Sequence, residues 1–289
     1  MASIERTAYP RFKPSLTPRE LHALYSPTDD ERAFITAHAR GAPQQLTLLT
    51  LLKCQQHLGY LPALAEVPTY IRTYLCQQLN LLPLLAPPVD AAKTLYRYRQ
   101  LIRTYLAITP YSEKGRAAVT TAVQHAAFTM SDPADLINVA VEHLVQQRIE
   151  LPAFRPLDRL VLHVRHSVHQ ELYARITASL EASAMARLDA LLHLRDGRTD
   201  FNRIKDTSRQ ATLNHLRQWT TRLTWLDALL PTRSFLTDIA HTKVQQFAAE
   251  AAALDVGDMR DIHDAPRRYS LLICFLSQAQ VHTRDAGSG

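Results

Sequence analysis

Residues 157–180 read LDRLVLHVRHSVHQELYARITASL, and this stretch decides the fold class. Its opening, residues 160–164, is the best candidate for a β-strand in the chain, because apolar residues dominate it. The apolar positions continue, however, at a four-residue spacing: Val164, Val168, Leu172, Ile176 and Leu180. Such spacing keeps one face of a helix apolar, whereas a half-buried strand alternates every second residue. We therefore predict one long helix here.

Glycine and proline set the lengths of the helices. Only five of the seven glycines are internal, and the alternating β-branched patterns of strands are largely missing between them. Of the 16 prolines, 14 lie at or before Pro156, and proline tolerates the first turn of a helix but breaks its interior. We therefore predict an all-α fold, with tandem small modules of the helix-turn-helix kind followed by a bundle of long helices.

Local signals mark helix ends and segment boundaries. Residues 17–20 (TPRE) and 28–31 (TDDE) each form a capping-box pattern, and Gly41 is placed to end the second of these helices. In the second half, heptad-like apolar steps predict helices that pack together, at Leu213, Leu216, Leu223, Leu226 and Leu230. Proline clusters divide the chain into segments 1–84, 85–152 and 153–286. Residues 287–289 (GSG) resemble a cloning linker, so we expect a truncation of a longer protein.

The composition narrows the class of protein. The chain has 289 residues, 46% of them hydrophobic and 21% charged, which is enough material for a sizeable core. No apolar run approaches the roughly 18 to 20 residues that cross a bilayer, and no apolar signal core follows the start. We expect a soluble intracellular protein with no membrane partner. Its net charge of +6 suits a polyanionic partner, although many ordinary proteins share it.

Patterns that carry catalytic chemistry are missing from the sequence. There is no phosphate-binding glycine loop, no H-E-x-x-H and no G-x-S-x-G, and the three cysteines form no C-x-x-C pair. On a helix, His163 and His169 would lie about 120° apart around the axis, which is poor for one metal. We expect those two and His166 to form a solvent- or phosphate-facing flank. The sequence therefore predicts no catalytic residues, no metal site and no cofactor in this chain.

Two basic stretches are candidates for binding nucleic acid. Residues 93–116 hold one acid, Glu113, and six basic residues: Lys93, Arg97, Arg99, Arg103, Lys114 and Arg116. Tyr96, Tyr98, Tyr105 and Tyr111 are interleaved with them, and tyrosine and arginine side chains both bind phosphate oxygens. The second stretch, residues 195–222, contributes Arg203, Lys205 and Arg209 as candidates. The alternative for each stretch is a solvated polar surface with no ligand.

A helix-turn-helix pattern lies in the first segment. Residues 46–58 form one predicted helix, Gly59 ends it, and a second helix runs from residue 67 to about 79. In DNA-binding proteins of this kind the second helix enters the major groove, where Arg and Gln contact base edges. The candidate contacts are Lys53, Thr69, Tyr70, Arg72 and Gln77. The alternative is an ordinary helical hairpin, because the connection is longer than the usual turn.

Several ordered stretches resemble a known family. The opening of the class II, cointegrate-forming transposases of bacteria is similar to residues 16–21 and 24–32, to residues 51–55, 58–64 and 67–68, to the basic run at residues 96–103, and to residues 149–152 and 157–161. The resemblance implies an amino-terminal region of small helical modules that binds the terminal inverted repeats of a transposon. It also implies that the catalytic carboxylates lie outside this chain, on a ribonuclease-H-like fold. It carries over Arg97, Arg99 and Arg103 as DNA contacts.

The sequence therefore leads to one main functional hypothesis and one alternative. The main hypothesis is sequence-specific binding of double-stranded DNA at transposon ends by a non-catalytic fragment, in the nucleoid of the bacterial cytoplasm. A homodimer formed through the parent protein is a further expectation, because a transposase must pair two ends. The alternative is a helical scaffold for self-association or for a partner protein, with Leu213, Leu216, Leu223 and Leu226 at the interface. For these leucines, the intramolecular core is the favoured interpretation.

Overall fold

The structure is a computed structural model of the chain that describes residues 3–81, 91–205 and 213–286. These residues form fourteen α-helices and one hairpin of two short strands, which confirms the predicted all-α fold. The chain divides into two compact units. Unit 1 comprises residues 1–123 and 133–161, and unit 2 comprises residues 124–132 and 162–289.

Unit 1 is built from helices of 8 to 17 residues. Its elements are η1 (Ile4–Arg6), α1 (Pro18–Tyr25), α2 (Asp29–His38), α3 (Ala42–Leu58), η2 (Leu64–Glu66), α4 (Thr69–Gln78), α5 (Ala92–Leu106), α6 (Glu113–Ala127) and α7 (Pro133–Gln146). It also contains the start of α8 (Phe154–Thr177), whereas the last four residues of α6, 124–127, belong to unit 2. In the described residues, no helix has the length and apolar character needed to span a membrane.

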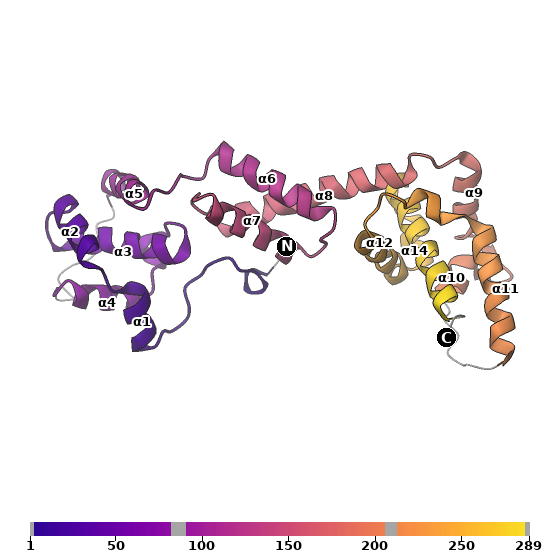
Figure 1. The fold of residues 1–289 in the computed structure, drawn as a ribbon, viewed down its shortest axis with the longest axis horizontal. Coiled ribbons are helices and arrows are strands. Elements are labelled where there is room, and N and C mark those ends of the chain that lie inside the picture. The colour runs from indigo at the N-terminus through magenta and orange to yellow at the C-terminus, as the bar shows by residue number, and fades with distance from the viewer. Residues whose placement is uncertain (1–2, 82–90, 206–212, 287–289) are drawn as a thin grey trace. The chain divides into compact units, whose positions relative to one another are not determined.

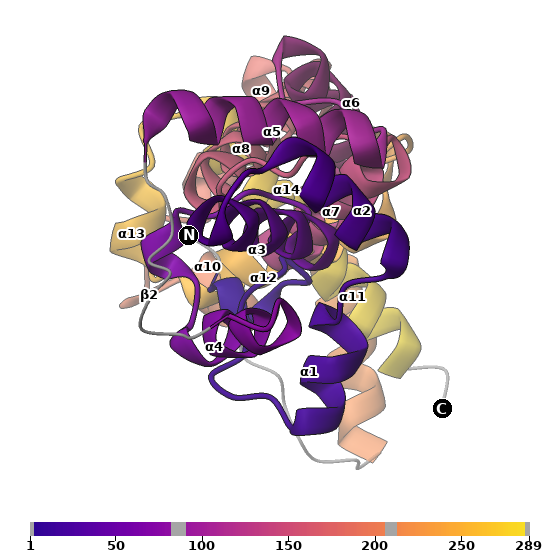
Figure 2. The ribbon, with the colours of Figure 1, turned by 90° about the vertical axis from the view of Figure 1, so that its left-hand side faces the viewer.

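Helix α3 is the centre of the hydrophobic core of unit 1. Its residues 46–55 are all buried, so the helix is covered on every side, as expected for a core helix. It contacts α1, α2, α4 and α5. Figures 1 and 2 agree that α5 lies on one side of α3, and that α1 and α4 lie on the other. Tyr98 and Ile102 of α5 are buried in the same cluster as residues of α1–α4.

The predicted three-segment division stays a prediction. Its first boundary, between residues 84 and 85, lies outside the described residues. The shared core of α3 and α5 places residues from the first two predicted segments in one compact unit, because the apolar face of α5 is buried against α3.

The two predicted capping boxes are present and mark where α1 and α2 begin. Thr17 accepts a hydrogen bond from the backbone of Glu20, whose side chain bonds back to the Thr17 N–H, and Thr28 and Glu31 repeat the arrangement. Gly59 ends α3 with a left-handed φ of 73°, as predicted. The expectation for Gly41 was wrong. Helix α2 already ends at His38, and Gly41, with φ 89°, occupies the N-cap of α3 instead.

A segment distant in sequence fastens α3 and α5. The N–H of Leu151 donates to the Gly59 carbonyl (2.8 Å), and the N–H of Glu150 donates to the Thr109 carbonyl (2.9 Å), just after α5. A Cβ on Gly59 would lie 3.1 Å from Cδ1 of Leu151, so glycine allows this close approach. Residues 149–151 therefore fix the end of α3 against the end of α5.

Unit 2 contains both long and short helices. Its elements are the remainder of α8, then α9 (Ala182–Ala190), β1 (Leu194–Arg195), β2 (Arg198–Thr199), α10 (Asp200–Lys205), α11 (Leu213–Leu229), η3 (Thr232–Phe235), α12 (His241–Ala253), α13 (Val256–Arg260) and α14 (Ala265–Ala286). Helix α14 contacts α9, α11, η3 and α12, and Figure 1 shows it between α11 and α12. Within the described residues, α8, α11 and α14 have 24, 17 and 22 residues, as the prediction of long helices requires, but α9, α10 and α13 have only 9, 6 and 5.

The helix expected at residues 157–180 is present as α8, which begins at Phe154 and ends at Thr177, so the prediction extended it three residues too far. Its four-residue apolar stripe is buried, and Leu180, just beyond the helix, is buried as well. In unit 2, Tyr173 of α8 packs against Phe247 of α12 with ring centres 5.0 Å apart. Leu226 of α11 and Leu230, the residue after that helix, are buried, which agrees with the core interpretation of the leucine series. The side chains of Leu213 and Leu216 lie outside the described residues.

Candidate nucleic-acid interface

Helix α5 has one buried face and one exposed polar face. Tyr98 and Ile102 are fully buried against the core of unit 1. On the opposite side, exposed positions recur at helical spacing: Lys93, Tyr96, Arg97, Gln100 and Thr104. We call these five residues the α5 stripe. Tyr96 is 66% exposed, an unusually large exposure for an aromatic side chain in a folded domain.

The α5 stripe is electropositive. Among the described residues, no ion pair joins Lys93 or Arg97 to an acid. The Arg97 guanidinium lies 5.2 Å from the centre of the Tyr98 ring. Two cations, an amide and a phenol on one open helical face can contact phosphates and base edges together. Lys93 and Arg97 were predicted as DNA contacts from the sequence, but Gln100 was not, because its exposure follows only from the helical register against the buried face.

Arg103 has a different environment from Arg97. Its Nε and Nη2 atoms both donate to Oε2 of Glu150, at 3.0 and 2.6 Å, and its side chain is only 20% exposed. Arg99 is half-buried, and its Nε has no hydrogen-bond partner. The basic run that the sequence suggested as DNA contacts thus has one outward arginine, Arg97. Arg103 instead ties α5 to residues 149–151.

Lys53 is buried rather than displayed. It forms an ion pair with Glu31 (2.7 Å), and the two side chains are 6% and 5% exposed. Burial raises the pKa of Glu31, but bonds from Lys53, Gln56 and Thr28 outweigh burial and hold that pKa below its usual value. Desolvating both charges is tolerated only because they are paired. Lys53 therefore stabilises the contact between α2 and α3, and we leave it out of the proposed DNA surface.

The polar side chains of α4 mostly hold neighbouring segments in place. The Tyr70 hydroxyl donates to the Lys13 carbonyl (2.6 Å), and the Tyr74 hydroxyl bonds to that of Ser26 (2.6 Å). Arg72 is half-buried and donates to Thr69 Oγ1 (3.3 Å). Thr69 and Gln77 are exposed. Helix α4, the predicted recognition helix, therefore offers fewer unengaged polar groups than α5.

The first turn of α6 presents a second basic site in unit 1. Lys114 and Arg116 are exposed, and Gly115 between them is buried. A Cβ on Gly115 would lie 2.9 Å from Cδ2 of Tyr111 and 3.2 Å from Cγ2 of Ile149. Glycine thus lets α6 approach residue 149, next to the Glu150 that holds Arg103. The same segment therefore positions both the α5 stripe and the start of α6.

Comparison with known proteins places these features in a family. Residues 1–164 match the family described as "Domain of unknown function (DUF4158)". The chain belongs to the DUF4158 family. Over 194 residues it is also 22% identical to "Transposase for transposon Tn3926" of Escherichia coli. That alignment covers 66% of the chain and only 18% of the transposase, so the chain is transposase-related and spans a small part of this relative. The DUF4158 match includes the α5 stripe and α6.

The second predicted basic stretch lies beyond the DUF4158 match, in unit 2. Arg203 pairs with the buried Asp200 (3.3 Å), and Lys205 donates to the Leu254 carbonyl. Burial lowers the pKa of Lys205, against an opposing effect of Asp255 and Asp258. Arg209 lies outside the described residues. Arg203 and Lys205 therefore serve mainly to hold α10 in place.

The expectation for the histidines of α8 was wrong at one position. His163 and His166 are exposed, but His169 is buried, and its Nε2 lies 3.3 Å from Nζ of the fully buried Lys243. Burial, together with Lys243, lowers the pKa of His169 to about 3, so the ring is neutral and can accept this hydrogen bond. Phe247 on α12 covers the ring, a long-range contact that the local pattern does not reveal. Among the described residues, no cluster of three metal-ligating side chains occurs.

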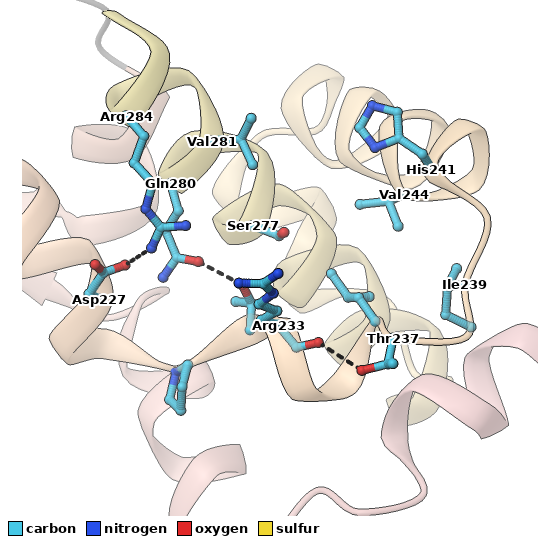
Figure 3. Close-up of a pocket in the computed structure, with 13 residues that line it drawn as sticks. Asp227, Arg233, Thr237, Ile239, His241, Val244, Ser277, Gln280, Val281 and Arg284 are labelled. Atoms are coloured by element: carbon cyan, nitrogen blue, oxygen red, sulfur yellow. Dashed lines mark hydrogen bonds and ion pairs between the residues drawn. The ribbon is translucent and has the colours of Figure 1, made fainter. Parts of the chain in front are cut away.

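Unit 2 also contains a half-open groove of about 870 Å³, which Figure 3 shows in close-up. Gln280 is fully bonded within it, because Oε1 accepts from Thr232 and Nε2 donates to the carbonyls of Leu226 and Leu230. Arg284 pairs with Asp227 (2.9 Å). The polar side chains of the groove therefore mainly fasten α11, η3 and α14 to one another.

Proposed function

We propose that this chain binds the terminal inverted repeats of a transposon and that the α5 stripe is its principal DNA-contacting surface. The relationship to a transposase supplies the class of ligand. The single observation that carries the proposal is the open face of α5, where Lys93, Tyr96, Arg97 and Gln100 lie side by side on a helix fixed by its other face.

The chemistry of these side chains suits a DNA groove. Glutamine can bond both the N6 and N7 positions of adenine in the major groove, and arginine bonds guanine or phosphate. Lys93 and Arg97 neutralise phosphates, and Tyr96 can pack on a sugar or bond a phosphate oxygen. Lys114 and Arg116 at the start of α6 extend the same basic region of unit 1. Arg103 and Glu150 act as positioning residues, because they hold the helix rather than touch the ligand.

In this proposal the chain supplies recognition and not the strand-transfer reaction. The catalytic step and the pairing of two ends belong to the remainder of a transposase, and the site of action is the bacterial nucleoid. The transposase relative is much longer than this chain, which agrees with such a division of labour.

The proposal is tested by fluorescence anisotropy with two labelled duplexes at several salt concentrations. One carries the terminal repeat of the transposon that encodes the chain, and the other is a scrambled duplex. We expect tighter binding to the terminal repeat. Four phosphate contacts, from Lys93, Arg97, Lys114 and Arg116, predict a slope of log affinity against log salt of about −3 to −4. Equal affinity for both duplexes would refute specific end recognition, and negligible binding to either would favour the scaffold alternative.

A further inference from the structure

Arg148, just beyond the end of α7, has a backbone conformation that is unusual for an arginine. Its φ is 51°, in the left-handed region. The N–H groups of Arg148 and Ile149 donate to the carbonyls of Val145 and Leu144, at 3.0 and 2.9 Å. These two bonds form a Schellman motif, whose left-handed position is usually glycine, because a Cβ there is sterically unfavourable. Arg148 therefore occupies a position at which glycine would be more stable.

The end of α5 provides a reference for this backbone conformation. Four non-glycine residues in the described ranges have a positive φ: Asn80, Ala107, Arg148 and Asp196. Asparagine and aspartate enter the left-handed region more readily than other side chains, which leaves Ala107 and Arg148. Ala107 follows α5 in the same motif, and the N–H of Thr109 donates to the Arg148 carbonyl (2.9 Å), so the two helix ends are joined. Ala107 thus has the same backbone strain without a charged side chain.

Nothing within the described chain explains the side chain of Arg148. It is exposed, and across residues 3–81, 91–205 and 213–286 it forms no hydrogen bond, ion pair or ring contact. The unfavourable backbone conformation is therefore not offset by packing or pairing of the arginine. Backbone strain of this kind is concentrated at positions that contact ligands.

The first turn of α6 brings two further cations to the same place. A Cβ on Gly115 would lie 3.2 Å from Cγ2 of Ile149, the residue after Arg148, so Lys114 and Arg116 on either side of Gly115 lie close to the end of α7. Both are exposed, and neither side chain has an ion pair or a hydrogen bond among the described residues. We call Lys114, Arg116 and Arg148 the α6–α7 cluster.

The α6–α7 cluster has an excess of positive charge. One acid, Glu113, lies in the same turn of α6, so three cations and one acid leave a net charge of +2. The acid that follows Arg148 by two residues, Glu150, is already paired with Arg103 (2.6 Å) and leaves the balance unchanged. The cluster is therefore suited to an anion.

We propose that the α6–α7 cluster binds phosphates of the DNA backbone and that Arg148 keeps its left-handed position for this contact. The inference rests on the proposed DNA-binding function, to which it adds a contact outside both basic stretches of the sequence. A guanidinium can donate two parallel hydrogen bonds to one phosphate, and phosphate contacts position a protein on DNA without reading its sequence. Arg148 adds a fifth contact to the four counted above, so the salt slope of the parent chain becomes about −4 to −5.

The test variant is Arg148→Gly in the whole chain, which removes the charge and relieves the backbone. Its midpoint of thermal unfolding should rise by about 2–4 °C, so weaker binding cannot result from unfolding. In fluorescence anisotropy, its affinity for the terminal-repeat and scrambled duplexes should fall by the same factor, about three- to tenfold near 0.1 M salt. The slope of log affinity against log salt should become less negative by about 1.

The matched control is Ala107→Gly, which relieves a φ of 52° at the end of α5 without removing a charge. It should raise the midpoint by a similar amount and leave the affinity and the salt slope unchanged. Arg148→Lys retains the charge and the backbone strain, so it should keep the salt slope and the midpoint of the parent chain.

An unchanged salt slope in Arg148→Gly would overturn the inference. An equal loss of affinity in Ala107→Gly would also overturn it, because relief of the backbone and not loss of the charge would then be responsible. Failure of the proposed function has a separate signature in the parent chain. Equal affinity for the two duplexes would refute specific end recognition alone, whereas binding to neither duplex would refute both proposals.

Discussion

The ion pair between Lys53 and Glu31 predicts the effect of the Lys53→Met substitution. Both side chains are almost fully buried and their charged atoms are 2.7 Å apart. Removing one partner of a buried pair costs about 3–5 kcal/mol, because the other charge is left without compensation. Glu31 retains hydrogen bonds from Gln56 and from the Thr28 backbone, so we expect the lower end of this range. The free energy of unfolding of unit 1 should fall by about 3 kcal/mol.

The assay must report on unit 1. Both tryptophans, Trp219 and Trp225, belong to unit 2, so their fluorescence does not follow the relevant transition. Far-ultraviolet circular dichroism gives the melting profile, and hydrogen exchange of peptides from α2 and α3 assigns it. For a unit of about 150 residues, a loss of 3 kcal/mol lowers the midpoint by roughly 6–12 °C.

The matched control is Lys93→Met, the same chemical change at an exposed position. It should leave the midpoint of thermal unfolding unchanged and weaken DNA binding. Lys53→Met should lower that midpoint and leave DNA binding unchanged, provided that binding is measured at a temperature at which the variant is folded. Adding Glu31→Gln to Lys53→Met should recover part of the lost stability, because the orphaned charge is then removed. An unchanged midpoint combined with weaker DNA binding in Lys53→Met would show that Lys53 contacts DNA and does not stabilise unit 1.

Two further predictions follow from buried contacts. Since burial and Lys243 lower the pKa of His169 to about 3, the unfolded state binds more protons between pH 3 and 6.5. The contribution of neutral His169 to the free energy of unfolding of unit 2 is therefore complete above pH 6.5 and is lost progressively below it, by about 2 kcal/mol at pH 5. His169→Phe should reduce this pH dependence when unfolding is followed by tryptophan fluorescence. Gly59→Ala should lower the free energy of unfolding of unit 1 by about 1–2 kcal/mol, because alanine disfavours the left-handed φ, and by a further amount because the added Cβ would crowd Leu151. Gly197 has a similar φ, but no atom lies within 4 Å of a Cβ built on it, so Gly197→Ala should lose stability from the φ alone. If thermal melts showed the same loss of stability for both variants, the close packing at Gly59 would be contradicted.

Features governed by local sequence were predictable. The capping boxes at Thr17 and Thr28, the end of α3 at Gly59 and the helix at α8 all depend on residues within one or two turns. These sequence signals determine helix ends through contacts between neighbouring residues, and tertiary contacts did not override them at these positions.

The pairing of charges was not predictable from the sequence. Lys53 and Arg103 look like ordinary basic side chains until Glu31 and Glu150, 22 and 47 residues away, are brought against them by folding. His169 shows the same limit, since its cover, Phe247, comes from a distant helix. The outward direction of Arg97 and Gln100 could have been predicted from the sequence. Tyr98 and Ile102 define the buried face of α5, and the α5 stripe lies on the opposite face.

The most direct test of the central claim compares the exposed polar residues of α5 with those of α4. Affinity for the terminal-repeat and scrambled duplexes is measured for Arg97→Ala with Gln100→Ala, and for Thr69→Ala with Gln77→Ala, after melting profiles confirm that both variants are folded. We predict that the α5 variant loses roughly tenfold or more of its preference for the terminal repeat, in line with about 1–3 kcal/mol for the base contact of Gln100, and that the α4 variant keeps it. Loss of preference in the α4 variant, with the α5 variant unaffected, would contradict the account.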